Sequence, residues 1–413
     1  MEAELLIHSA DCLYTCRGPA PRRGEAQRQA GLIEDAAIAA SGGVIVAVGP
    51  TTDVRREVPL AAGATVVDAS GGTVLPGFVD PHTHLVYGGD RRDELRRRLA
   101  GATYAEIAAG GGGIVKTVRA TRGAAEEQLV ATALPRLAAM LRCGTTTVEI
   151  KSGYGLDTES ELRMLRAIRA LATRQPIEIS ATFMGAHDVP IDYRARRDDY
   201  VRLIVDDMLP AVAAEKLAEW CDVFCEQGVF TPEETRTILE AGVRHGLAPR
   251  VHADELALSG GSAIAAQVGA RSADHLIHVD AAHAHLLAEA GVVATLLPAA
   301  AFFLKLGRFA PARTLIEAGV AVALATDMNP GGGFSPSMPF AMTLACFGMM
   351  MTFEEALVAA TINGASSIDR AHVVGSLEPG KQFDAVLVAG PATNLLRVNH
   401  SPIVAVFKKG RES

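Results

Sequence analysis

The stretch FVDPHTHL, residues 78–85, decides what fold and what chemistry to expect of this chain. An apolar run ends in a proline, and His82 and His84 follow two residues apart. In an extended strand, residues i and i+2 point to the same face, so both imidazoles are directed at one point. Such convergence favours either a shared metal ion or a polar network. The pair alone leaves both alternatives open, because chance and core packing also produce it.

Composition narrows the class of protein. The 413 residues are 49% hydrophobic and 21% charged, enough apolar material for a large globular core, and the formal net charge is −8. An acidic chain without a long basic run is not expected to bind nucleic acid. The N-terminal segment lacks the pattern of a secretory signal, and the most apolar run, residues 290–304, is too short to span a membrane. We therefore expect a soluble, cytoplasmic protein without a membrane partner.

The six cysteines allow two interpretations. Cys12 with Cys16, and Cys221 with Cys225, are each separated by three residues, which permits a four-cysteine zinc site. The alternative is free thiols in a reducing compartment, some of them packed in the core. The stretch CDVFC has the pattern of a buried strand, in which residues i and i+4 are too far apart to share a metal ion. We therefore expect free thiols.

The chain separates into β-rich ends and an alternating middle. Residues 1–74 contain short β-like runs, interrupted by residues 17–31, which have the composition of an exposed loop. Residues 376–413 are β-like again, and we expect both ends to form one small β-sandwich domain. Within residues 75–375, eight apolar runs alternate with amphipathic helical patterns, which predicts a (β/α)8 barrel.

One helical pattern, residues 126–144, places its apolar residues at helical spacing and ends in Gly144, a good stop signal. Pro135 lies inside this pattern. Because proline lacks a backbone N–H, it predicts a kink or a late start for the helix.

The eight apolar runs share one feature at their C-terminal ends, where chemistry is located in such barrels. Five of the twelve histidines fall on or just after these ends, which favours the metal interpretation of residues 78–85. The ends carry, in order, His82 and His84; Glu149 and Lys151; His187; Glu226; His252 and Glu255; His275; Pro298; and Asp327.

These motifs resemble those of the amidohydrolase superfamily, and within it those of the imidazolonepropionase family. The resemblance covers residues 70–390 and is carried by HLVYGGDRRDE, GGGIVKTVRATR, EIKSGYGLDTESEL, TFMGAHDVP, HADEL, GARSADHL, LLPAAAFFL and ATDMNPG. It implies a barrel of the amidohydrolase type and hydrolysis of 4-imidazolone-5-propanoate to N-formimidoyl-L-glutamate. It also implies a homodimer.

The resemblance further implies a site. One Zn²⁺ or Fe²⁺/Fe³⁺ per chain would be held by His82, His84, His252 and Asp327, an arrangement with a position left open for water. Glu255 is expected as the proton-transferring base, His275 as the hydrogen-bonding partner of the water or oxyanion, and Asp327 as a second participant in proton transfer. The expected substrate contacts are Arg91, Tyr154, His187, Glu255, Asn329, Gly331 and Gly332. A guanidinium suits a propanoate carboxylate, so Arg91 is expected to bind that group.

Two stretches depart from the family pattern. Gly332 occupies a position where the family usually has a hydroxyl side chain, and the resemblance implies that the loop containing it is about two residues longer than in the family. Ser335 is a candidate replacement for that hydroxyl, and LLPAAAFFL has alanines near the expected pocket. These departures keep open a related deaminase or cyclic-amide hydrolase with a shifted substrate. A scaffold without enzymatic activity is disfavoured, because it would not need this whole site.

Three further residues have two interpretations each. Lys151 suits either a carbamylated bridge between two metal ions or an ion pair with Glu149 behind the site, and the second is favoured by its position. Tyr154 suits either packing or substrate contact, and its glycine-rich strand-end loop favours contact. Arg91 suits either a solvated charge, as expected for Arg92, or a contact with substrate, and only the resemblance favours the contact.

Overall fold

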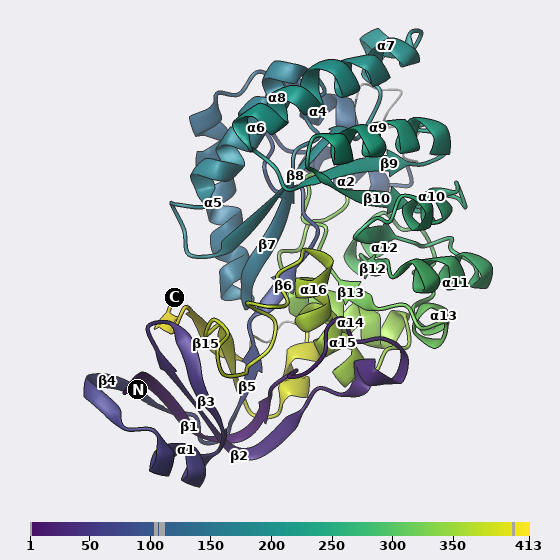
Figure 1. The fold of residues 1–413 in the computed structure, drawn as a ribbon. Helices are drawn as coiled ribbons and strands as arrows, with labels where there is room; N and C mark the ends of the chain where they lie inside the picture. Colours follow the sequence, from purple (N-terminus) through teal and green to yellow (C-terminus); the bar gives the residue numbers. More distant parts are fainter. Residues whose placement is uncertain (1, 103–105, 107–111, 399–400) are drawn as a thin grey trace.

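The computed structural model describes residues 2–102, 106, 112–398 and 401–413, which form a barrel and a separate β-sheet (Figure 1). The barrel is an eight-stranded parallel sheet in the order β13-β12-β11-β10-β9-β8-β7-β6. All eight strands expected from the sequence are therefore confirmed. Their bounds are β6 Phe78–Asp80, β7 Thr145–Lys151, β8 Glu178–Ala186, β9 Trp220–Cys225, β10 Ala248–Ala253, β11 Ser272–His275, β12 Val293–Leu296 and β13 Val322–Leu324.

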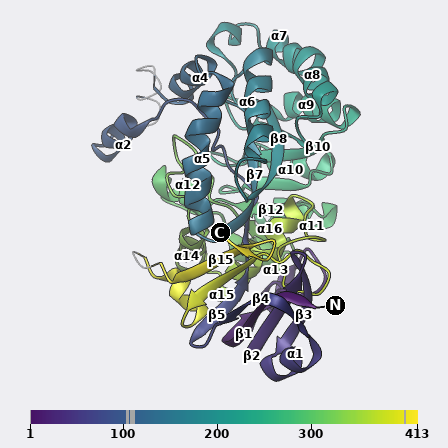
Figure 2. The same ribbon diagram turned by 90° about the vertical axis from the view of Figure 1, so that its left-hand side faces the viewer.

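Helices surround this barrel on its outside (Figures 1 and 2). Those between the strands are α2 Arg92–Leu99, α4 Ile114–Arg122, α5 Glu126–Arg142, α6 Thr158–Leu171, α7 Arg197–Arg202, the π-helix η3 Leu203–Met208, α8 Leu209–Glu215, α9 Pro232–Arg244, α10 Gly261–Gln267, α11 Ala281–Ala290, α12 Pro298–Phe303 and α13 Ala312–Glu317. Three more, α14 Met338–Gly348, α15 Phe353–Ala360 and α16 Ile362–Ser367, follow β13. Short 3-10 turns are η1 Gly24–Arg28, η2 Ile191–Tyr193 and η4 Ala392–Leu396.

Helix α5 tests the expectation for Pro135. The helix runs without interruption from Glu126 and contains Pro135, so a late start is wrong. It ends at Arg142, and Gly144 follows with φ +90°, as the stop signal predicts.

Strand β7 shows how the sequence builds the barrel. All seven of its residues are buried, yet they alternate between two environments. Val148 and Ile150 belong to the large apolar core, whereas Glu149 and Lys151 form hydrogen bonds and ion pairs with other strands inside the barrel. The barrel interior is therefore polar at this level and the surrounding layer is apolar.

A lower layer of the barrel interior is apolar. Trp220, the single tryptophan of the chain, packs there with Val79, Ile368 and Val374. Its indole Nε1 donates to Ser180 Oγ over 2.9 Å, and the guanidinium of Arg250 lies 5.8 Å from its ring centroid. The polar layer that contains the predicted site therefore packs against an apolar layer that contains Trp220.

The segments after β6 and β13 meet and bring the first and last strands together. Asp80 accepts hydrogen bonds from Thr326 N and Thr326 Oγ1, over 3.1 and 2.5 Å. Beyond them, Asp327 N donates to His82 O and His84 N donates to Met328 O. These contacts place the histidines of FVDPHTHL beside Asp327.

The β-rich unit expected from both chain ends is present as one branched eight-stranded sheet. Its bounds are β1 Ala3–Tyr14, β2 Leu32–Ser41, β3 Val44–Pro50, β4 Leu60–Asp68, β5 Gly72–Pro76, β14 Ala385–Ala389, β15 Ile403–Lys408 and β16 Arg411–Glu412, with helix α1 Thr51–Glu57. β14 pairs with β5, which joins the two ends of the chain. The domain boundaries 74/75 and 375/376 stay a prediction.

Residues 17–31 are mostly exposed, as the sequence predicts, but Arg22, Gln27 and Ala30 are buried. Gln27 is fully buried: its Nε2 donates to Val322 O, and its Oε1 accepts from Val322 N. Arg22 N donates to Asn363 Oδ1. The segment thus supplies polar partners to the start of β13, which composition alone does not reveal.

Two smaller expectations are also settled. All six cysteines, which lie within the described ranges, are free thiols. Over the part of the chain that the structure describes, no helix combines the length and hydropathy needed to cross a membrane.

Candidate metal centre and active site

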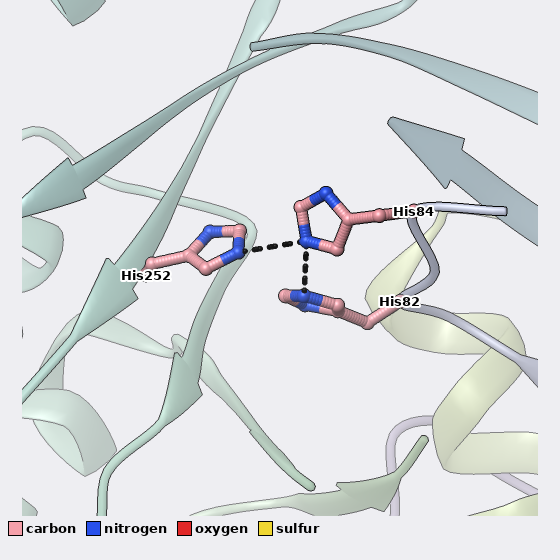
Figure 3. A group of neighbouring side chains, drawn as sticks. All are labelled: His82, His84 and His252. Carbon is pink, nitrogen blue, oxygen red and sulfur yellow. Dashed lines mark hydrogen bonds between the residues drawn. The ribbon is translucent and has the colours of Figure 1, made fainter. Parts of the chain in front are cut away.

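Three histidines converge at the C-terminal end of the barrel (Figure 3). His84 Nε2 lies 3.3 Å from His82 Nε2 and 3.2 Å from His252 Nε2, and all three side chains are buried. Asp327 Oδ1 lies 3.7 Å from His82 Nε2 and 3.8 Å from His84 Nε2. The four residues that the sequence predicted as ligands are therefore brought together.

The other ring nitrogens of His82 and His252 explain how these two rings are oriented toward His84. His82 Nδ1 lies 2.7 Å from Asp274 Oδ2, and His252 Nδ1 lies 3.0 Å from Asp222 Oδ1. A carboxylate only accepts, so each Nδ1 carries the proton and each Nε2 keeps its lone pair. Neighbouring lone pairs repel unless a cation lies between them. The donor set therefore fits a metal ion, and three imidazoles with one carboxylate suit zinc and iron.

A buried ion network lies behind these histidines. Lys151 Nζ contacts Glu149 Oε1 at 2.9 Å, Asp222 Oδ2 at 2.8 Å and Asp274 Oδ2 at 3.8 Å. Arg250 Nη2 contacts Asp274 Oδ2 at 3.1 Å. This geometry agrees with the favoured interpretation of Lys151 as a pairing residue behind the site.

Mutual pairing keeps this network charged. Burial opposes the charged form of Lys151, but the carboxylates of Asp222 and Glu149 raise its pKa above the ordinary value. Burial likewise opposes the charged form of Asp222, but His252 and Lys151 hold its pKa well below the usual range. Burial lowers the pKa of His82 and of His84, so both rings stay neutral and able to bind a metal ion.

The groups expected to move protons lie beside the histidines. Burial, together with the charges of Asp327 and Glu226, raises the pKa of Glu255 to about 8. A group that accepts and returns a proton works best with a pKa near the operating pH. His275 Nδ1 lies 3.6 Å from Glu255 Oε1, and burial holds the pKa of His275 well below its ordinary value. A neutral imidazole there can donate a hydrogen bond to a developing oxyanion.

A cavity of about 940 Å³ opens onto this group. Eleven of the twelve predicted site residues line it, and His82 lies beneath them, fully buried. The lining members are His84, Arg91, Tyr154, His187, His252, Glu255, His275, Asp327, Asn329, Gly331 and Gly332. The functional role of each residue stays a prediction, although their convergence in one cavity is a structural fact.

The loop after Asp327 is organised by Asn329. Its Oδ1 accepts from Gly331 N and Gly332 N over 2.7 Å each, and its Nδ2 donates to Asp327 O over 2.8 Å. Gly333 must lack a side chain, because a Cβ there would overlap the carbonyl oxygen of Asp327. The glycines of this loop thus allow it to fold back tightly on a predicted metal ligand.

The sequence analysis did not identify several residues that support the site. Asp222 and Asp274 are buried in the barrel: Asp274 lies opposite His252 in the strand register and Asp222 lies opposite Arg250, two residues before His252, so both point to the same side as His252. Arg98 lines the cavity and donates from Nη2 to Gly331 O. Glu161 binds the backbone of the SGYG stretch from a neighbouring helix. A strand-register argument would have found the aspartates, but tertiary contacts alone reveal Arg98 and Glu161.

Comparisons with known proteins agree with this geometry. The model of the Amidohydrolase family matches residues 73–412. Imidazolonepropionase of Symbiobacterium thermophilum is 52% identical over 99% of this chain and 96% of that protein. Imidazolonepropionase of Geobacillus kaustophilus is 50% identical over 94% and 92%. The chain belongs to the imidazolonepropionase family of amidohydrolases. As an imidazolonepropionase-family member, it is a hydrolase.

Solved structures support the fold of this imidazolonepropionase-family chain. A triazine hydrolase variant superposes with a TM-score of 0.77 at 18% identity, covering 99% of this chain and 94% of that one. An adenosine deaminase from Xanthomonas campestris, crystallised with zinc, gives a TM-score of 0.70 at 21% identity, covering 100% and 93%. At such identities the likeness establishes the barrel and terminal sheet, and nothing about substrate.

Proposed function

We propose that the chain hydrolyses 4-imidazolone-5-propanoate to N-formimidoyl-L-glutamate with one zinc or iron ion held by His82, His84, His252 and Asp327. The observation that carries this proposal is the convergence of the ligands with Glu255 and His275 in one cavity, in a chain about half identical to imidazolonepropionases. When bound, the metal ion supplies Lewis-acid chemistry and lowers the pKa of water. The proposal includes a cytoplasmic homodimer without nucleic-acid or membrane partners, as the acidic composition and family resemblance favour.

The chain's own residues account for the proton movements. Glu255 takes a proton from the water that attacks the ring carbonyl carbon and delivers it to the ring nitrogen when the carbon–nitrogen bond breaks. The products are a carboxylate and a formimidoyl nitrogen, and one proton is released. His275 donates a hydrogen bond to the oxygen on which negative charge develops. The imidazolone ring of the substrate is held in the cavity by Tyr154, His187, Asn329, Gly331 and Gly332.

Metal quantification and a substrate assay on one purified sample test this proposal. We expect about one metal ion per chain, as four-ligand mononuclear sites bind, and N-formimidoyl-L-glutamate as the product identified by mass. His252→Ala should lose both, whereas His245→Ala, an exposed histidine outside the barrel, should lose neither. Bound metal with ammonia release, or with no turnover, would favour the alternative of a related deaminase or cyclic-amide hydrolase.

Arg91 gives a prediction about specificity. Arg91 lines the cavity, and its Nε donates to Glu94 Oε2 over 2.7 Å, which leaves the other end of the guanidinium beside Gly331. If it binds the propanoate carboxylate, Arg91→Met should raise KM about ten- to hundredfold, the loss expected for a charge-assisted hydrogen bond. The exposed neighbour provides the control: Arg92→Met should leave KM unchanged. An unchanged KM in Arg91→Met would remove Arg91 from substrate binding.

A further inference from the structure

The loop 153–156, which follows β7, is held by a charged side chain from α6. Glu161 is fully buried in the first turns of that helix. Its carboxylate accepts from Gly153 N at 3.0 Å, Gly155 N at 2.7 Å and Leu156 N at 2.9 Å. One carboxylate therefore satisfies three backbone N–H groups of this loop that strand pairing leaves without a partner.

A second charged residue holds the same loop by its carbonyl groups. Arg122, at the end of α4, donates from Nε to Gly155 O over 2.6 Å and from Nη2 to Leu156 O over 3.0 Å. Gly155 must lack a side chain, because a Cβ would lie 2.6 Å from Glu161 N. The loop is thus fixed from two sides and pressed against α6, with Tyr154 as the side chain at its centre.

The fixed loop reaches the cavity through two groups. Tyr154 lines the cavity, with its ring 5.9 Å from that of His84 and 5.2 Å from that of His187. Gly153 O lies 3.0 Å from His187 Nδ1, so the loop also sets the orientation of His187. The ring of His187 in turn stacks on His84 at 4.8 Å. Neither Glu161 nor Arg122 lines the cavity itself.

We propose that Glu161, with Arg122, is a positioning residue for substrate binding: it fixes the loop 153–156 so that Tyr154 and His187 are preorganised in the cavity. Preorganised binding groups lower the entropy lost when a ligand binds, so a loosened loop weakens binding of substrate. This inference rests on the proposed function for its substrate, but the contacts of Glu161 and Arg122 with the loop 153–156 do not depend on that function.

Glu161→Gln tests the proposal, since it keeps the shape but replaces one accepting oxygen with an NH₂ group that repels backbone donors. We expect KM for 4-imidazolone-5-propanoate to rise about tenfold, the equivalent of one hydrogen bond to a charged group, with metal content unchanged. Glu159→Gln is the control, because Glu159 is exposed on the same helix and pairs only with Arg163 among the described residues. A wild-type KM in Glu161→Gln would overturn the proposal, even if the variant were less stable.

A second variant and a second readout keep the proposal testable if Glu161→Gln does not fold. Arg122→Lys retains the charge but loses the two-point donation to the loop, and it should raise KM in the same way. In nitrogen NMR of the folded variant, the signals of His187 should change from an Nδ1-protonated ring to a tautomer mixture. Unchanged KM and unchanged His187 signals would overturn the proposal. If the wild type fails to hydrolyse this substrate, the function fails, and the His187 signals alone decide the inference.

Discussion

At the scale of single residues, Lys151 contacts none of the expected metal ligands, yet it contacts the residues that orient two of them. Its ammonium contacts both aspartates that orient His82 and His252. Without it, the three carboxylates of Glu149, Asp222 and Asp274 would remain close together in a buried layer, with Arg250 in contact with Asp274. Metal binding should therefore depend on Lys151 although the metal ion would not touch it.

Lys151→Met should weaken metal binding about 10- to 100-fold, the usual effect of losing a partner behind a metal ligand. Competition against a chelator of known affinity measures this change. Lys116→Met is the control, since Lys116 forms a partly exposed ion pair with Asp93. Wild-type metal affinity in Lys151→Met would show that Arg250 alone suffices to orient the aspartates.

Gly333 gives the second prediction at this scale. Gly333→Ala would push a methyl group into the carbonyl of Asp327, so we expect loss of bound metal, together with destabilisation of about 1–3 kcal/mol, as for an overpacked site. Gly332→Ala is a matched control for metal content, because its Cβ would meet only the flexible side chain of Leu304 at 3.1 Å. Metal analysis and urea unfolding distinguish the two. Equal metal content in both variants would mean that the loop can move without displacing Asp327.

Single residues also mark what the sequence can reveal. The convergence of His82, His84, His252 and Asp327 was predictable because each lies at or just after the end of a strand, and parallel strands end at one edge of a barrel. Their selection as the ligand set came from the family resemblance. The strained backbone at Asp327, with φ +50°, was not predictable, because it depends on the fold of the following loop. Glu161 was equally hidden, since it binds a loop from a helix with an ordinary amphipathic pattern.

At the scale of elements, the barrel strands were identifiable by their apolar runs and helical spacers, but the closure of the barrel was not. β6 and β13 are only three residues each, too short for a strong periodic signal. Their continuations are joined by Asp80 and Thr326 and by backbone bonds at the histidines. The burial of Gln27 within the mostly exposed segment 17–31 was hidden for a related reason, because its backbone partner lies far away in the sequence.

Thr326→Val tests the closure. It removes the hydroxyl that donates to Asp80, and a buried carboxylate loses one partner, so the free energy of unfolding should fall by about 1–3 kcal/mol. Thr295→Val on β12 is the control: that hydroxyl is also buried but makes no hydrogen bond to any residue that the structure describes. Urea unfolding should show little change or a gain for Thr295→Val. Equal losses in the two variants would contradict a special role for the Asp80 contact.

At the scale of the whole molecule, metal binding and barrel stability should be linked, because the predicted ligands come from the segment after β6, from β10 and from the segment after β13. A ligand present at a hundred times its dissociation constant stabilises the folded state by about 2.7 kcal/mol. Chelation should therefore lower the Tm reported by Trp220, whose fluorescence follows the barrel alone. Adding zinc or iron should restore it, and His252→Ala should respond to neither treatment. A Tm that does not change on chelation would contradict a site shared across the barrel.

The pairing of β5 with β14 has a consequence for how the molecule is made. Ribosomes deliver β1–β5 first and β14–β16 last, so the edge of β5 has no partner until the barrel between them has been synthesised. A nascent or prematurely terminated chain that lacks Ala385–Glu412 exposes that edge at the moment when it is most prone to associate with other chains. Stop codons near the end of the gene should therefore be as damaging to yield as stop codons within the barrel, although every predicted site residue has already been translated.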